Sequence, residues 1–358
     1  MPFIIVEEDR ILRLIQVILD PQTTPERMSA FADFNSTDQA DFPGWLAQLR
    51  TNLPDLFPAT VQLVNSQEEL QQYLPQADVA IVESLAIGNV ELNLAKKLKV
   101  IYKFGTLTDN IDDAACKQAG IPMLTLRRRT NIAMAEHTMM LVLALAKRLP
   151  AITNRLTEDQ MIEAGSPFRP YDTRHTAGAN YARIQGLKTL HDCSIGLLGF
   201  GEIGRELAKL ANAFGLSVFY NKKNRLSQLE EAELHVTYCD FDELFKKSDF
   251  LSVHVPYSEK TKDLIGSTQL NLMPPGSYLI NTSRAHIVNH DALLEALRSG
   301  KLAGAAADVH YKEPVDDTEQ LLHIKQFIMT PHLGGGSRMN GLKDAEVMLT
   351  NINNYLSK

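Results

Sequence analysis

The chain has 358 residues, of which 44% are hydrophobic, and this is enough for about two domains with cores of their own. Its formal net charge of -7 at pH 7 argues against a nucleic-acid binder whose affinity rests on overall positive charge. The three cysteines, Cys116, Cys193 and Cys239, are odd in number and lack the spacing of metal ligands. We therefore expect reduced thiols and no metal site.

Neither the start of the chain nor its most apolar stretch predicts export or a membrane span. Residues 1–10 contain a short apolar run followed by acidic residues, without the basic start and longer apolar region of a secretory signal. The most apolar stretch, residues 139–146, is far shorter than the roughly 18 residues that a membrane-spanning helix needs. We therefore expect a cytoplasmic protein that does not bind membranes.

The first third of the chain alternates between strand and helix patterns. Strands are expected at residues 11–19, 61–64, 79–82, 100–104 and 122–126, with residues 20–60 read as loop-rich. Helices are expected at residues 67–73, 89–98 and 110–118. Such alternation predicts a parallel sheet covered by helices.

A long apolar helix at residues 131–149 is expected to link two domains. Residues 150–192 are polar and poorly periodic, and a connection of this length usually wraps something or takes part in function. The alternation then resumes, with strands expected at 194–198, 217–220, 235–238, 250–255, 278–282, 304–309 and 327–330. Helices are expected at 202–214, 226–233, 242–247, 267–272, 290–299 and 340–356.

Residues 193–225 form a strand, a glycine turn, a helix and a second strand within about 30 residues. The turn contains Gly199, Gly201 and Gly204 in the spacing G-x-G-x-x-G. In this context the first glycine permits a tight turn, the second lets the backbone approach a pyrophosphate, and the third lets helix and strand pack closely. The pattern therefore predicts a dinucleotide-binding site at the start of the helix.

The end of the second strand indicates which dinucleotide binds. An Asp or Glu at that point would bond the ribose hydroxyls, and here Asn221 follows the strand instead. Lys222, Lys223 and Arg225 come next, and cations at this rim would attract a 2′-phosphate. The pattern favours NADP over NAD, although a solvated basic turn would look the same.

Ligands of such sheets bind at the carboxyl ends of the strands, so the residues that follow the later strands are candidates for the site. Arg284, in Asn281-Thr282-Ser283-Arg284, has the planar fork that suits a carboxylate substrate. His332 follows the last strand, and a nearby carboxylate would stabilise its imidazolium form for general acid-base chemistry. Val255, Pro256 and Thr261 follow the fourth strand and give a weaker signal.

Six blocks of the sequence together resemble the D-isomer-specific 2-hydroxyacid dehydrogenases. They are GFGEIG, NTSRAHIV, AADVHYKEP, TPHLGGGS, KFGTLTDNIDDAACKQAGIP and AMAEHTMMLVLALAKR, and the match covers about residues 78–358. The resemblance implies an α/β protein of two doubly wound parallel-sheet domains with a cleft between them. A flavodoxin-like split substrate domain would comprise residues 1–126 and 336–358, and a Rossmann-type NAD(P)-binding domain residues 127–335. It also implies a homodimer formed through the cofactor domain.

The resemblance further implies roles for individual residues. Arg284 would bind the substrate carboxylate, His332 would donate a proton to the carbonyl oxygen, and Glu313 would pair with His332. Backbone of Gly105, Thr106 and Leu107 would cradle the carboxylate of a 2-oxo or 2-hydroxy acid. Cofactor contacts would come from Gly199, Gly201, Glu202, Ile203, Gly204, Asn221, Lys222, Val255, Pro256, Thr261, Thr282, Ser283, Arg284, Asp308 and His332, with Asp308 meeting the nicotinamide carboxamide.

Several positions depart from the family pattern and leave the substrate open. Ala285, Asn289-His290 and His310 replace residues that are commonly Gly, an acidic pair and Phe. Arg127-Arg128-Arg129 replaces a stretch that is commonly rich in Pro, Gly and Ala. These three arginines recognise a second anionic group, or they form a solvated basic loop; the sequence favours neither.

Alternative functions also stay open. Glyoxylate, hydroxypyruvate and larger 2-oxo acids all fit, while a phosphoglycerate dehydrogenase with a regulatory domain is disfavoured because the chain ends at Lys358. A formate dehydrogenase would have Gln in place of Glu313, and a phosphite dehydrogenase stays open. A dinucleotide-sensing binding protein of the corepressor type would share the fold and would bind the cofactor without useful turnover.

Overall fold

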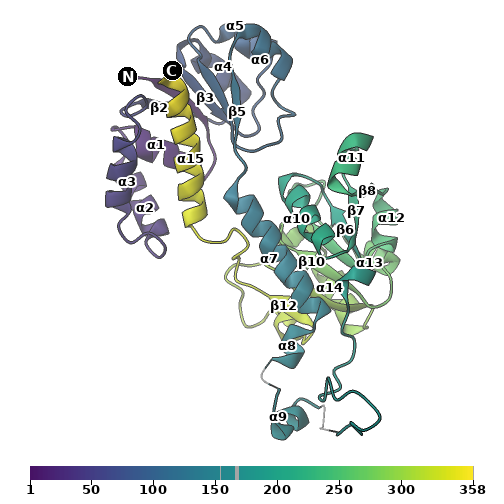
Figure 1. Cartoon of the computed structure of the whole chain (residues 1–358). Coiled ribbons are helices and arrows are strands. Elements are labelled where there is room, and N and C mark those ends of the chain that lie inside the picture. Colours follow the sequence, from purple (N-terminus) through teal and green to yellow (C-terminus); the bar gives the residue numbers. More distant parts are fainter. Residues whose placement is uncertain (154, 166–168, 358) are drawn as a thin grey trace. The chain divides into compact units, whose positions relative to one another are not determined.

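The computed structural model describes residues 1–153, 155–165 and 169–357. The chain forms two compact units (Figure 1). Unit 1 comprises residues 1–132 and 335–358, and unit 2 comprises residues 133–334. Each unit is built on one sheet whose neighbouring strands are all parallel.

Unit 1 contains a five-stranded sheet in the order β2-β1-β3-β4-β5. This is the flavodoxin-like strand order, in which the second strand lies on one side of the first and the later strands lie on its other side. The strands are β1 (Phe3–Glu7), β2 (Thr60–Val64), β3 (Val79–Val82), β4 (Val100–Lys103) and β5 (Met123–Thr125). The helices are α1 (Arg13–Leu19), α2 (Pro25–Asn35), α3 (Phe42–Thr51), α4 (Gln67–Tyr73), η1 (Leu74–Gln76), α5 (Asn89–Leu94), α6 (Asp113–Ala119) and α15 (Met339–Leu356).

The expected first strand at residues 11–19 is wrong, because that segment contains helix α1 and the strand lies earlier, at Phe3–Glu7. The apolar run is buried almost all round, so its spacing does not distinguish a helix from a strand. Asp9 decides the outcome locally, since its Oδ1 accepts the backbone N–H groups of Ile11 and Leu12. The stretch read as loop-rich also holds α2 and α3, which begin with the capping residues Thr24 and Asp41, each followed by a proline in the first turn.

The C-terminal helix α15 belongs to unit 1 although 202 residues of unit 2 come between the two parts of the chain. Its buried face includes Leu342, Met348 and Ile352, which share one hydrophobic cluster with Ile4 of β1. Unit 1 is therefore assembled from two separate parts of the chain.

Unit 2 contains a seven-stranded sheet in the order β12-β11-β10-β9-β6-β7-β8. Within this order β8-β7-β6-β9-β10-β11 is the Rossmann arrangement, extended by β12. The strands are β6 (Ser194–Leu198), β7 (Ser217–Asn221), β8 (Thr237–Tyr238), β9 (Phe250–Val253), β10 (Ser277–Asn281), β11 (Leu302–Ala307) and β12 (Phe327–Met329).

Helices accompany this sheet along the chain. They are α7 (Arg129–Ala146), which starts in unit 1, and then α8 (Leu149–Ile152), α9 (Glu158–Glu163), η2 (Leu190–Asp192), α10 (Glu202–Ala213), α11 (Gln228–Leu234), α12 (Phe241–Lys246), α13 (Ser267–Leu272), η3 (Ala285–Ile287), α14 (His290–Arg298) and η4 (Gln320–His323). None of the described helices is long and apolar enough to cross a membrane.

Two hydrophobic clusters cover the sheet of unit 2. Leu197 packs in a cluster with residues of α7 and α10, whereas Leu198 packs with residues of α12, α13 and α14. Successive residues of a strand point to opposite faces, so the two clusters lie on the two faces of the sheet. With both faces covered, the carboxyl edge of the strands is where polar side chains gather.

Candidate active site

The glycine turn after β6 has the geometry of a phosphate cradle. Gly199 has φ +90°, and a Cβ added there would lie 2.6 Å from the carbonyl carbon of His254, so only glycine fits. Gly201 caps α10 without a side chain, and a Cβ added there would meet nothing within 4 Å. Open space at the start of a 12-residue helix fits the pyrophosphate of a dinucleotide.

Residues 221–225, at the end of β7, offer less free positive charge to a ligand than their sequence indicates. Asn221 donates from its side-chain amide to the carbonyl of Cys239 at 2.8 Å. Arg225 forms two hydrogen bonds of 2.8 Å with the carboxylate of Glu231 and lies over the ring of Tyr238. One of the three cations is thus already neutralised, and the lysine pair 222–223 keeps the positive charge of this rim.

The loops after β9 and β10 are tied to each other. Ser283 donates its hydroxyl to the carbonyl of Val255 at 2.5 Å, and Thr282 shares a hydrogen bond of 3.0 Å with Thr138 of α7. Arg284 is exposed and donates from Nη1 to the carbonyl of Ser283, which leaves the rest of its guanidinium facing outward. Thr261, in contrast, bonds within its own turn, to the carbonyl of Pro256 at 2.8 Å.

His332 and Glu313 form a pair beyond β12 and β11. The Nδ1 atom of His332 lies 2.8 Å from Oε2 of Glu313, and the two side chains are 48% and 39% exposed. A carboxylate can only accept, so Nδ1 carries a proton, and within the described part of the chain Nε2 has no hydrogen-bond partner. The pair therefore presents one imidazole nitrogen to an incoming molecule.

The ionised form of Glu313 is favoured by its neighbours. Desolvation opposes ionisation, but hydrogen bonds from His332 and from the backbone N–H of His310 outweigh it and lower the pKa of Glu313 below its ordinary value. The negative charge of Glu313 lies directly against Nδ1 of His332. This arrangement can hold and deliver a proton.

Asp308 is fully buried and organises the turn that carries His332. Its Oδ1 accepts the hydroxyl of Thr330 at 2.5 Å and the N–H of Leu333 at 2.8 Å, and its Oδ2 accepts the N–H of Gly334 at 2.6 Å. A Cβ at position 334 would lie 2.8 Å from that same Oδ2, so the close approach requires glycine. The predicted contact of Asp308 with the nicotinamide stays a prediction.

Two residues near this turn were missed by reasoning from the sequence. His137, on α7, places its Nε2 3.0 Å from Oγ1 of Thr330 and 3.3 Å from Oδ1 of Asp308. Thr330 and His137 are 193 positions apart, and nothing in their spacing connects them. Only the packing of α7 on the sheet reveals the contact.

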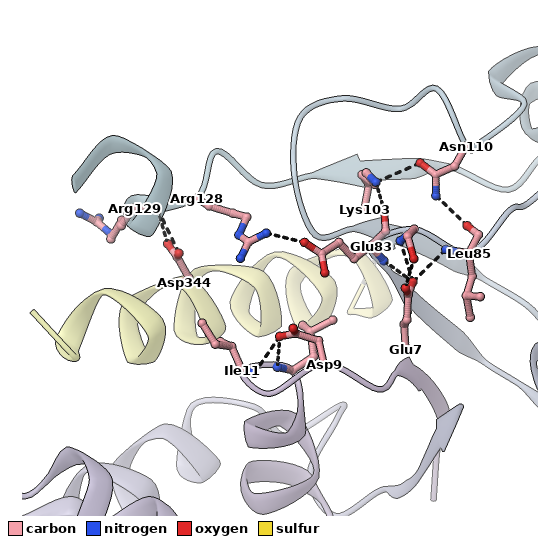
Figure 2. Close-up of polar contacts among 12 residues, drawn as sticks. Glu7, Asp9, Ile11, Glu83, Leu85, Lys103, Asn110, Arg128, Arg129 and Asp344 are labelled. Carbon is pink, nitrogen blue, oxygen red and sulfur yellow. Dashed lines mark hydrogen bonds and ion pairs between the residues drawn. The ribbon is translucent and has the colours of Figure 1, made fainter. Parts of the chain in front are cut away.

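The predicted substrate loop lies in unit 1, at the carboxyl end of β4. Gly105 has φ +148°, and its carbonyl accepts the N–H of Leu126 at 3.0 Å. Lys103, at the end of the strand, is buried and binds Oδ1 of Asn110 at 2.9 Å as well as the carbonyl of Glu83 (Figure 2). The loop that contains Thr106 and Leu107 is therefore bracketed by strand-end contacts on both sides.

Two residues of the basic segment 127–129 are engaged within unit 1. Figure 2 shows Arg128 directed at Glu83. Nη1 of Arg128 lies 2.6 Å from Oε1 of Glu83, and the guanidinium also covers the ring of Phe104. The backbone N–H of Arg129 donates to the carboxylate of Asp344 on α15. Burial raises the pKa of Glu83, and Arg128 opposes this shift. At least one of the three arginines is thus already paired with a carboxylate of the protein.

A family model for the NAD-binding domain of the D-isomer specific 2-hydroxyacid dehydrogenases matches residues 139–334, more than half of the chain. The chain belongs to that family. This confirms the expected family and the expected pair of parallel-sheet α/β domains. It also assigns NAD(H) binding to unit 2, which contains the glycine turn and the His332–Glu313 pair.

Several known proteins are similar to this chain over most of its length. The glyoxylate reductase of Thermococcus litoralis is 34% identical over 261 residues, which cover 73% of this chain and 75% of that protein. The hydroxypyruvate reductase of Thermotoga maritima is 32% identical over 274 residues, which cover 76% of this chain and 82% of that protein. The solved structure of a Granulicella m. formate dehydrogenase is 29% identical, with a TM-score of 0.52, and covers 85% of this 2-hydroxyacid dehydrogenase and 78% of its own chain.

Proposed function

We propose that this dehydrogenase interconverts a 2-oxo acid and a D-2-hydroxy acid, with His332 as the proton donor and acceptor. The observation that carries the proposal is the half-exposed pair of His332 and Glu313 at 2.8 Å. It stands at the same edge of the sheet as the glycine turn, because all strands of unit 2 are parallel. A general acid is what the reduction of a ketone requires beyond hydride transfer.

The chemistry divides between the cofactor and the protein. NAD(P)H supplies the hydride when it is bound. His332 gives the proton on Nε2 to the carbonyl oxygen as the oxo acid is reduced, and takes it back in the reverse direction. Glu313 holds Nδ1 and so fixes the orientation of the ring and stabilises its positive form.

Arg284 is proposed to bind the substrate carboxylate. Its exposed guanidinium can form the bidentate contact that a planar carboxylate accepts. Backbone of Gly105, Thr106 and Leu107 is proposed to complete the carboxylate site. Positive charge near the carbonyl also stabilises the negative charge that develops on its oxygen during reduction.

The proposal is tested by a panel of substrates. NADH and NADPH oxidation is measured with glyoxylate, hydroxypyruvate and larger 2-oxo acids, and cofactor reduction with formate and phosphite, with His332→Ala as the control. We expect turnover of at least one 2-oxo acid by the wild type, lowered about 10²- to 10⁴-fold in the variant. Equal inertness of both proteins on the whole panel would favour a dinucleotide-sensing binding protein. Turnover of formate or phosphite alone would show that the substrate is one of these small anions and not a 2-oxo acid.

We further propose that NADPH is preferred over NADH. Support comes from Asn221 at the end of β7, where no carboxylate side chain stands to repel a 2′-phosphate, and from Lys222 and Lys223 beside it. The Asn221→Asp variant should shift the ratio of kcat/KM toward NADH by about tenfold or more, since one charge contact at this rim is worth on the order of 1–2 kcal/mol. An unchanged ratio would refute the preference.

We also propose a homodimer formed through unit 2. An apolar groove runs along α7, α8 and α10 and includes Met140, Leu143 and Leu149; the first and last of these are 46% and 50% exposed. Exposed apolar surface of this kind marks a protein interface. Analytical ultracentrifugation should give a dimer for the wild type and a monomer for Met140→Glu, and a monomeric wild type would contradict the assignment.

A further inference from the structure

We infer that His137 and His310 are positioning residues that hold the turn carrying His332 in its reactive conformation. The inference rests on the proposed role of His332 as proton donor. Both histidines contact Thr330, two positions before His332. His137 meets its hydroxyl at 3.0 Å, and His310 meets its carbonyl at 2.9 Å.

The turn needs such support because His332 is held in an unfavourable backbone conformation. Its φ is +56°, in the left-handed region, which costs a residue with a Cβ about 1–2 kcal/mol. Conformations of this kind persist only where several contacts with the surrounding structure hold them in place. Asp308 supplies one set of contacts, through the N–H groups of Leu333 and Gly334, and the two histidines supply the other.

The direction of each hydrogen bond follows from its partners. The hydroxyl of Thr330 donates its hydrogen to Oδ1 of Asp308, so Oγ1 can only accept from His137. A carbonyl oxygen also only accepts, so Nε2 of His310 donates to it. Both imidazoles therefore carry their proton on Nε2, and each satisfies a different acceptor of Thr330.

The two histidines also reach the groups on either side of the turn. Nε2 of His137 also lies 3.3 Å from Oδ1 of the fully buried Asp308, the carboxylate that binds the turn. His310 donates its backbone N–H to Oε1 of Glu313 at 2.9 Å, while Oε2 of that carboxylate holds His332. Loss of either imidazole removes a donor to Thr330, whereas the backbone N–H of residue 310 still reaches Glu313.

The consequence is for the rate of the reaction more than for binding. Displacement of a reacting group by about 1 Å can cost 10²-fold in rate. The contacts of the glycine turn and of Arg284 do not involve Thr330. Removing the contacts of His137 and His310 with Thr330 should therefore lower kcat. The affinity for the cofactor and the KM for the oxo acid should stay nearly unchanged.

The test uses the 358-residue chain, four variants of the two histidines and one control variant. His137→Leu and His310→Phe remove the donors, while His137→Gln and His310→Gln keep an N–H near the position of Nε2. We expect kcat for the best 2-oxo acid to fall about 10- to 100-fold in the first two, with KM and the NADH dissociation constant changed by less than about threefold, and to recover substantially in the Gln variants. His323→Leu, an exposed histidine of η4, serves as the matched control and should keep wild-type kcat.

Failure of this inference is distinguishable from failure of the proposed function. Suppose the wild type reduces the oxo acid and His332→Ala does not, but His137→Leu and His310→Phe keep wild-type kcat. The positioning role of the two histidines is then refuted and the proposed function stands. If kcat and NADH affinity fall together and glutamine restores neither, the two histidines support the fold only, and the inference is again refuted. If His137→Leu does not fold, His310→Phe and the two Gln variants decide the matter alone.

Discussion

Both sheets have polar residues at their carboxyl edges, but these residues differ in exposure and in what they contact. In unit 1, Glu7 and Lys103 are 8% and 6% exposed, and each is engaged with the loop after β3. Glu7 accepts the N–H groups of three successive residues, 83 to 85. In unit 2, the side chains of Glu313 and His332 are 39% and 48% exposed, and one nitrogen of His332 faces outward.

Polar strand ends alone therefore do not mark a catalytic site. A buried charge whose hydrogen bonds are all made within the fold braces loops, whereas an exposed group with an orienting partner can act on a ligand. Unit 2 contains both kinds, since Asp308 is fully buried beside the exposed pair. We therefore expect substitutions of exposed residues at the carboxyl edge of the unit 2 sheet to affect catalysis. Substitutions of buried residues at the carboxyl edges should affect stability.

The largest expected effect is on the exposed edge of unit 2, at Arg284. Arg284→Lys keeps the charge but loses the planar fork, so we expect kcat/KM for the oxo acid to fall about 10²- to 10³-fold. The melting temperature should stay close to that of the wild type because the guanidinium is exposed and, among the described residues, bonds only the carbonyl of Ser283. Steady-state kinetics and a thermal scan measure both. Wild-type kinetics in this variant would remove Arg284 from the proposed substrate site.

His254 extends the comparison to a partly buried titratable group at the edge of unit 2. Desolvation lowers its pKa to about 4, and its Nε2 shares a 2.8 Å hydrogen bond with Ser252. The unfolded chain, with a histidine pKa of about 6.5, takes up the proton first, so stability is full above that pH and falls as the pH drops toward 4. The loss should be about 1.4 kcal/mol per pH unit, up to about 3 kcal/mol.

Urea unfolding at pH values from 4 to 7 measures this slope, with His254→Gln as the control. The variant should lose most of the slope, because glutamine does not titrate. A parallel dependence in both proteins would assign the acid sensitivity to other groups.

The smallest effect is expected at the buried edge of unit 1. Glu7→Gln replaces one accepting oxygen with an amide that cannot accept, and leaves N–H groups of the 83–85 loop without their carboxylate. We expect the free energy of unfolding to fall by about 2 kcal/mol, measured by urea unfolding, with kcat of the folded protein close to that of the wild type. A large loss of kcat at unchanged stability would show that this edge also takes part in catalysis.

Much of unit 2 was predictable from the sequence because its signals are local. The glycine turn and the expected helix at 267–272 coincide with observed elements, and the residues that follow the parallel strands lie at one edge, as the strand rule requires. The pairing of Glu313 with His332 followed from family resemblance, and the structure brings these residues together.

The rest depended on tertiary contacts that leave no local pattern. Helix α1 was read as a strand because nearly every side chain in it is buried, which hides the helical period. The basic rim at 221–225 looked stronger than it is, since Glu231 neutralises Arg225 from the following helix. His137 was passed over because a single histidine on an apolar helix gives no sign of what it packs against.

The most direct test of the central claim is a single-turnover measurement on His332→Gln. Enzyme and reduced cofactor are premixed, cofactor binding is quantified by fluorescence, and hydride transfer to the best 2-oxo acid is followed by stopped-flow absorbance. We expect wild-type cofactor affinity and hydride transfer slowed at least about 10²-fold, because the carbonyl oxygen loses its proton donor. Transfer at the wild-type rate in this variant would contradict the assignment of His332.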